Sequence, residues 1–152
     1  MQCRRYAVIE KWREIHQGDI FDANIPALRH GSIQAGFRPV IIVSANWINK
    51  TSDVFTVAEL TTSLKNPTMT VHYILPVIPG LPQRSMVLGE ATARLIRDDL
   101  IRYRCTVPED IYKNVDRAVR CGMRGRNRHK NRKQSRQSEK NNKKNRKKKK
   151  KQ

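Results

Sequence analysis

The strongest constraint on this chain is the separation of its charge from its apolar residues. Of its 32 Lys and Arg residues, 17 lie in the last 33 positions, which hold only 1 of the 13 acidic residues and no apolar residue after Met123. Such a segment cannot offset the conformational entropy that ordering costs. Residues 122–152 are therefore predicted to form a disordered basic tail, which leaves about 120 residues for a single modest core.

The pattern before the tail predicts a mostly β fold, a small, strongly curved antiparallel barrel. Alternating or apolar runs separated by turn residues predict strands over 18–25, 38–45, 54–60, 69–75, 85–90 and 100–105. Residues 91–96 extend the fifth strand or bend from it at Gly89. The run Val40–Val43 is apolar on both faces, which predicts a strand buried between layers. Residues 46–53 are predicted to be a polar turn.

Helices are predicted at both ends of this domain. Apolar residues spaced mostly by three predict a short amphipathic helix in residues 1–16. The spacing Thr106-x-x-Glu109 is that of a capping box, and apolar residues then recur on one face as far as Val119. The predicted organisation is an N-terminal extension (1–16), a domain (17–121) and the tail (122–152).

Composition also bears on where the protein works. Its 3 cysteines form no C-x-x-C pair, which is typical of a reducing compartment, and no run approaches the roughly 18 apolar residues of a spanning helix. A cytoplasmic protein without a membrane partner is expected. Neither the cysteines nor the histidines have metal-ligand spacing, so no cofactor is expected.

A glycine-containing loop delivers an arginine to the predicted central strand. Gly31 and Gly36 make the loop flexible, and Arg38 follows at the first residue of the strand. A planar guanidinium on a rigid sheet can bind two phosphate oxygens at once. His30 lies in the same loop and could carry a proton near neutral pH, although it could equally be an exposed loop histidine.

Several ordered motifs in residues 16–120 resemble the MazF/PemK family of toxin endoribonucleases. Gln17-Gly18-Asp19-Ile20-Phe21 and Gly31-Ser32-x-Gln34-x-Gly36-x-Arg38-Pro39-Val40 are similar to the family's opening segments. Val57-Ala58-Glu59-Leu60-Thr61-Thr62-Ser63 is similar to V-A-x-I/L-T-S, and Ser85-Met86-Val87-Leu88-x-Glu90 to S-V-I-L-x-E. Val115-Asp116-Arg117-Ala118-Val119 resembles the V-D-E-A-L helix.

This resemblance implies a barrel of the PemK type and a sequence-selective, metal-independent endoribonuclease. The enzyme would cut single-stranded RNA by attack of a 2′-hydroxyl, leaving 2′,3′-cyclic phosphate and 5′-hydroxyl ends. The resemblance also implies a homodimer and a cognate antitoxin partner. It assigns catalysis to Arg38 and Thr61, and it places five further residues at the substrate: Ser32, Gln34, Gly36, Ser63 and Glu90.

The chain departs from the family pattern at several positions. Ile33 stands where the family has a loop glutamate, Ala35 replaces one glycine, and Ala91-Thr92-Ala93 follows Glu90 where Gln and Arg are frequent. His72 is displaced by one position from the family's P-T-H-V. A noncatalytic RNA- or ribosome-binding barrel therefore stays open as an alternative.

The C-terminal end bears on two further alternatives. A gyrase poison like the CcdB toxins would need an aromatic C-terminal end, whereas this chain ends in five lysines and Gln152. The tail is expected to attract RNA or ribosomes without sequence preference, since it is basic and lacks aromatic residues for base stacking. The other interpretation of the tail is an appendage without a selected role.

Overall fold

The computed structural model describes residues 13–26 and 35–124. The predicted tail from residue 125 onward, residues 1–12 of the predicted N-terminal helix and residues 27–34 of the loop lie outside them. Residues 13–16 are not helical, and Ile15 packs into the core with 4% of its surface exposed. The described part of the N-terminal extension is therefore part of the folded domain.

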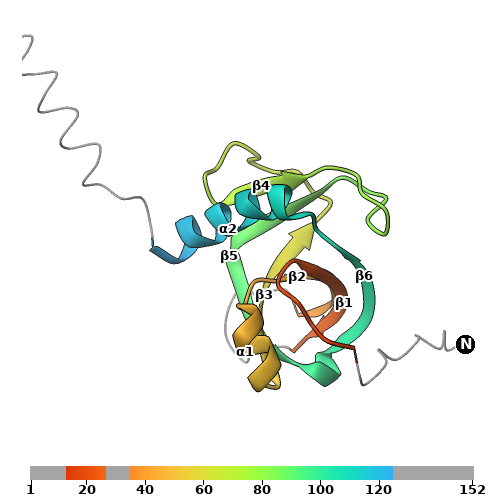
Figure 1. Ribbon diagram of the computed structural model, residues 1–152. Helices are drawn as coiled ribbons and strands as arrows, with labels where there is room; N and C mark the ends of the chain where they lie inside the picture. Colours follow the sequence, from red (N-terminus) through yellow and green to blue (C-terminus); the bar gives the residue numbers. More distant parts are fainter. Residues whose placement is uncertain (1–12, 27–34, 125–152) are drawn as a thin grey trace, which may run out of the picture.

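Six antiparallel strands form one curved sheet. They are β1 (Asp19–Ile25), β2 (Gly36–Ile42), β3 (Val54–Thr61), β4 (His72–Leu75), β5 (Ser85–Ile96) and β6 (Leu100–Thr106). Their order in the sheet is β4-β5-β3-β2-β1-β6. Figure 1 shows the strands curling around a common interior, with α2 (Glu109–Arg124) across β4 and β5 and α1 (Asn46–Thr51) near β3. The predicted mostly β barrel with a C-terminal helix is confirmed.

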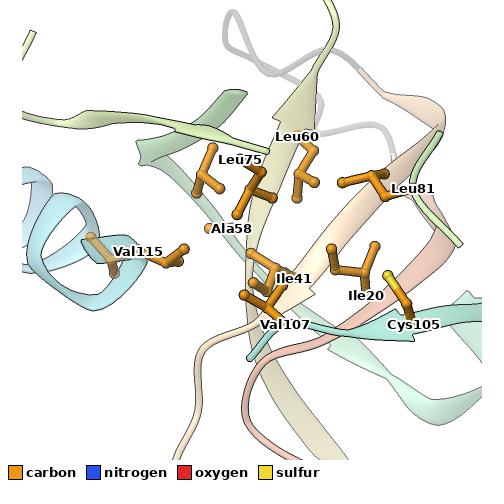
Figure 2. Packing of buried hydrophobic residues seen from close by; sticks show 11 residues of the cluster. Ile20, Ile41, Ala58, Leu60, Leu75, Leu81, Cys105, Val107 and Val115 are labelled. Atoms are coloured by element: carbon orange, nitrogen blue, oxygen red, sulfur yellow. The ribbon is translucent and has the colours of Figure 1, made fainter. Parts of the chain in front are cut away.

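Side-chain alternation gives the sheet two apolar faces. One face packs against α2, and Figure 2 shows Ile20, Ile41 and Leu60 gathered on it with Leu75, Leu81 and Val115. The other face forms the second cluster, which includes Phe21, Val40, Ile42, Phe55, Val57 and Leu95. Because β1, β2 and β3 contribute to both clusters, they are buried on both sides. For β2 alone, the apolar run at Val40–Val43 predicts this burial.

A bulge in β5 allows α2 to approach the sheet. Ala58 pairs with Thr92, but the next residue, Glu59, pairs with Leu88, so residues 89–91 are extra on β5. A Cβ added at Gly89 would lie 2.4 Å from the carbonyl oxygen of Ala118. Only glycine fits this contact. Of the two alternatives for residues 91–96, the structure shows the extension, because β5 continues to Ile96 beyond the bulge.

Four local predictions differ from the structure. The predicted turn at 46–53 contains α1, because Asn49 donates to the carbonyl of Ser44 at 3.1 Å and accepts the Ser44 hydroxyl proton at 2.6 Å. β4 begins at His72 rather than residue 69, because backbone turn bonds occupy Met69 and His72. Thr106 forms no capping box, since its hydroxyl donates to Asp19. Finally, α2 continues through Arg124, so the predicted tail begins three residues too early.

No helix in residues 13–26 or 35–124 combines the length and the hydropathy needed to cross a membrane. Cys105 and Cys121 are both free thiols. Burial raises the pKa of the Cys105 thiol, with Asp19 acting in the same direction and Arg104 opposing it.

Candidate functional site

Arg38 stands near the start of β2, directly across from Ala23 on β1. The strand begins at Gly36, whose φ of +115° is a backbone conformation that other residues rarely adopt. The side chain of Arg38 is 20% exposed, and its Nη1 donates a hydrogen bond to Oε2 of Glu59 on β3. The sheet therefore presents a partly exposed arginine that is anchored to a carboxylate.

Glu59 is a charged residue on an otherwise apolar strand face. It follows Phe55 and Val57 at alternate positions of β3, both of which belong to the second apolar cluster. Its side chain is 6% exposed, and its backbone pairs with Val40 on β2 and Leu88 on β5. A carboxylate in such a place is costly unless a cation pairs with it, and Arg38 supplies that cation.

Thr61 ends β3 two residues beyond Glu59, on the same face of the strand. The backbone pairing between β2 and β3 ends at Val40 and Glu59. Extending the same register by two residues places Thr61 opposite Arg38. The hydroxyl of Thr61 accepts the backbone N–H of Ser63 at 3.1 Å. A hydroxyl that accepts one hydrogen bond still has its own proton to donate.

Glu90 lies in the β5 bulge and bonds to His72. The two atoms, Nε2 of His72 and Oε1 of Glu90, are 2.8 Å apart, and Nδ1 of His72 lies 2.8 Å from the carbonyl oxygen of Asn66. A carbonyl can only accept, so Nδ1 of His72 donates to Asn66, and Nε2 shares the second hydrogen bond with the Glu90 carboxyl group. The imidazole is 6% exposed and Glu90 is 46% exposed, so the histidine holds the carboxylate at the surface.

The strand pairing also relates Glu59 to His72, the residue that bonds to Glu90. Leu88 is the partner of both Glu59 and His72, which places the three on one face of neighbouring strands. His72 is two strands from Glu59, about 10 Å at the usual strand spacing. The polar residues on this otherwise apolar face are together called the polar face below: Arg38, Thr61, Glu59 and the His72–Glu90 pair.

The structure brings together part of the predicted site. Arg38 and Thr61 share the polar face, Ser63 and Gly36 adjoin them in the chain, and Glu90 lies toward β4. His30, Ser32 and Gln34 fall outside the described residues. In the described part of the chain, no three His, Cys, Asp or Glu side chains are grouped as metal ligands.

Sequence reasoning gave no role to Glu59 or His72. Glu59 carries a visible signal, since a charged residue at an inward position of an alternating strand demands a partner. His72 has no comparable signal, because its pairing with Glu90 depends on the three-residue bulge that no spacing rule predicts.

The polar face combines a cation with a hydroxyl. A guanidinium carries its N–H donors in one plane, and the neighbouring Thr61 hydroxyl can donate one more hydrogen bond. Both stand at the open end of the β2–β3 ladder.

The comparisons with known proteins agree with this fold. An endoribonuclease from a mycobacterial species, in complex with its cognate antitoxin, has a TM-score of 0.58 and 18% identity, covering 72% of this chain and 94% of its own. MazF from Deinococcus radiodurans has a TM-score of 0.61 and 19% identity, covering 71% and 94%. At such identities the likeness shows the fold alone.

No curated protein sequence matches the chain. The family model of PemK-like, MazF-like toxins of type II toxin–antitoxin systems matches residues 16–121, which is most of the chain and includes every described residue of the polar face. The chain therefore belongs to the PemK-like, MazF-like toxin family.

Proposed function

We propose that this protein is the toxin of a type II toxin–antitoxin pair and an endoribonuclease that cleaves single-stranded RNA. Family membership supports the toxin role, and the solved structures with a similar fold include endoribonucleases from mycobacterial species. The observation that carries the catalytic proposal is the anchored Arg38 on the same face as Thr61, at the end of the β2–β3 ladder.

In the proposed reaction a 2′-hydroxyl oxygen attacks the adjacent phosphorus and the 5′-oxygen leaves. Arg38 donates to the non-bridging oxygens as negative charge develops on them. Thr61 donates from a second direction and orients the phosphate for in-line attack. Because the protein supplies both donors, the proposed reaction needs no metal ion.

Two protons must also move, one from the 2′-hydroxyl and one to the departing 5′-oxygen. A guanidinium gives up its proton poorly, since its pKa lies above about 12. We assign His30, from the loop before β2, as the candidate proton carrier. A His30→Ala variant is expected to lower turnover and change its pH profile, whereas unchanged turnover would remove His30 from the mechanism.

Selection of the cleavage sequence would come from polar groups around this centre. Unpaired bases are recognised through hydrogen bonds to their edges. We assign Ser32, Gln34, Gly36, Ser63 and Glu90 to that role. The exposed carboxylate of Glu90, held by His72, is suited to accept hydrogen bonds from base amino groups.

The proposed partners follow from the family. Some similar structures are complexes of a toxin with its antitoxin, among them MazE–MazF of Deinococcus radiodurans. We propose a homodimer in the cytoplasm whose RNA groove is blocked by an acidic antitoxin segment. An added antitoxin peptide would then protect RNA and compete with it for the polar face.

End mapping tests the proposed activity. The purified protein is incubated with long single-stranded RNA in excess chelator, and the termini are identified chemically. The expected result is discrete cuts that leave 2′,3′-cyclic phosphate and 5′-hydroxyl ends. A 2′-deoxy substitution immediately before one cut should block that cut alone. Cleavage that needs a metal, or ends with 5′-phosphate, would contradict the mechanism.

The Arg38–Glu59 pair also suits a second function, a noncatalytic RNA-binding barrel in which Arg38 is a structural cation. That protein would bind RNA with salt-sensitive affinity and leave it intact. In this case Arg38→Ala would weaken binding slightly and remove no activity.

A further inference from the structure

We infer that Glu59 is a positioning residue that holds the guanidinium of Arg38 in the orientation that the phosphate requires. This inference rests on the proposed function, because it assigns a role within the same reaction. Nothing in the family resemblance gives this position a role, since it falls at the variable residue of the V-A-x-I/L-T-S motif.

The location of Glu59 makes it a rigid anchor. Its backbone is paired on both sides, to Val40 of β2 and to Leu88 of β5, and its side chain is 6% exposed. A carboxylate with so little exposure has few alternative positions and no ready exchange with water. The hydrogen-bond acceptor that Arg38 meets is therefore fixed relative to the sheet.

Arg38 needs such an anchor because its side chain is long and partly exposed. An arginine has about 2 kcal/mol of rotamer entropy to lose when it is held in one geometry. The bond from Nη1 to Oε2 of Glu59 fixes one corner of a planar group, and the plane then determines where the remaining N–H groups point. Because the guanidinium plane is fixed before RNA binds, the entropy cost of ordering the Arg38 side chain does not add to the activation free energy.

The two partners of the pair differ in exposure. The Glu59 side chain is 6% exposed and the Arg38 side chain is 20% exposed, so more of the arginine than of the carboxylate is open to solvent. A phosphate that approaches from solvent therefore reaches the arginine more readily than the carboxylate. Glu59 thus acts through Arg38 and needs no contact with RNA.

Two substitutions separate this role from a merely structural one. Glu59→Gln keeps the shape and one acceptor oxygen for Arg38, whereas Glu59→Leu removes the acceptor and suits the apolar surroundings. Misplacement of a reacting group by about 1 Å can cost about 100-fold in rate. We expect kcat to fall about 10- to 100-fold in Glu59→Leu and less in Glu59→Gln, with KM changed by less than about threefold.

Asp22→Asn is the matched control. Asp22 is another little-exposed carboxylate of the barrel, and it pairs with Arg102 and Arg104 at 2.8 and 2.7 Å. It lies on the opposite side of β1 from Ala23, the cross-strand partner of Arg38. Its replacement should lower stability while kcat per folded molecule stays within about twofold. All variants are compared as full chains after their folded fraction has been measured.

A second readout does not depend on activity. In ¹⁵N spectra, an arginine side chain held by a carboxylate shows slow rotation of its guanidinium and slow exchange of its N–H protons. Wild type is expected to show a slow signal that disappears in Arg38→Lys and speeds up in Glu59→Leu. Fast rotation of Arg38 in the wild type would overturn the inference.

The kinetic outcomes are equally decisive. Equal or higher kcat in folded Glu59→Leu would overturn positioning and show that the carboxylate competes with phosphate for Arg38. If wild type leaves RNA intact, the proposed function fails. The guanidinium signals then still decide whether Glu59 holds Arg38.

Discussion

Replacing Gly89 by alanine tests how α2 is fastened to the sheet. A Cβ at this position would lie 2.4 Å from the carbonyl oxygen of Ala118 and 2.7 Å from that of Val71. These atoms belong to the backbones of α2 and of the segment before β4, so no side-chain rotation relieves the contact. Relief to an ordinary separation of at least 3.4 Å requires the helix or the strand to shift by about 1 Å.

The expected cost follows from two opposing terms. Overpacking of this kind costs about 1–3 kcal/mol, and the upper end applies because backbone atoms close the space on both sides. Alanine returns about 0.5–1 kcal/mol by restricting the unfolded chain. The net loss is about 2 kcal/mol, which lowers the Tm by about 8–12 °C for a folded domain of this size.

Thermal and urea unfolding measure this loss. Lys113→Ala, on the exposed side of α2, is the control and should change stability by less than about 0.5 kcal/mol. Gly122 makes an equally close approach, since a Cβ added there would lie 2.4 Å from the carbonyl oxygen of Gly89. The double variant with Gly122→Ala should lose less than the sum of the single losses, because one displacement of α2 relieves both contacts. Unchanged stability in Gly89→Ala would refute this description of the interface.

Three further predictions follow from single features of the chain. Arg38→Ala should lose about 3 kcal/mol of stability in urea unfolding, because it leaves the Glu59 carboxylate buried without its cation, and adding Glu59→Gln should restore most of that loss. Burial raises the pKa of the Tyr112 phenol, with Asp116 acting in the same direction and Arg120 opposing it, so the neutral form is favoured by folding. The free energy that neutral Tyr112 contributes to stability is complete below the unfolded-state pKa of about 10 and is lost as the pH rises toward the higher folded-state pKa. As the pH is raised from about 9 to about 11, the Tyr112→Phe variant should therefore lose less stability than wild type. Deleting residues 125–152 should weaken RNA binding and make the salt dependence of log K shallower by about 0.7 for each phosphate contact removed, whereas an unchanged slope would leave the tail without a binding role.

Sequence patterns predicted the architecture well where one physical signal dominates. Alternating and apolar runs located all six strands, because a strand buried on one or both faces has few other ways to satisfy its side chains. Gly89 was named only as a point where the strand could bend, and the bulge of β5 includes it because a glycine has no Cβ to meet α2. The helix face of Val115, Ala118 and Val119 was predicted and is buried.

The misses have a common cause in contacts between distant residues. α1 depends on the Ser44–Asn49 pair rather than on helix propensity, and Thr106 bonds to Asp19 across 87 positions instead of capping its own helix. β4 is short because backbone turns precede it. Such competitions between local and tertiary partners cannot be read from spacing.

The candidate site also contains residues that the sequence indicated and contacts that only the structure shows. Arg38 and Thr61 were named through the family resemblance, and the strand register gives them a common face. Glu59 could have been found from the sequence as a charge on an apolar strand face, but its pairing with Arg38 required the register. Pairing of His72 with Glu90 depends on the bulge and could not have been predicted.

The proposed function depends above all on stabilisation of the reacting phosphate by Arg38. The most direct measurement compares cleavage of one long single-stranded RNA, in excess chelator, by wild type and by the double variant Arg38→Ala/Glu59→Gln. This variant removes the guanidinium and also the buried charge that would otherwise destabilise the protein by about 3 kcal/mol. Discrete cuts by wild type and intact RNA with the folded double variant are expected. Cleavage at the same sites and rates by both proteins would contradict this role of Arg38.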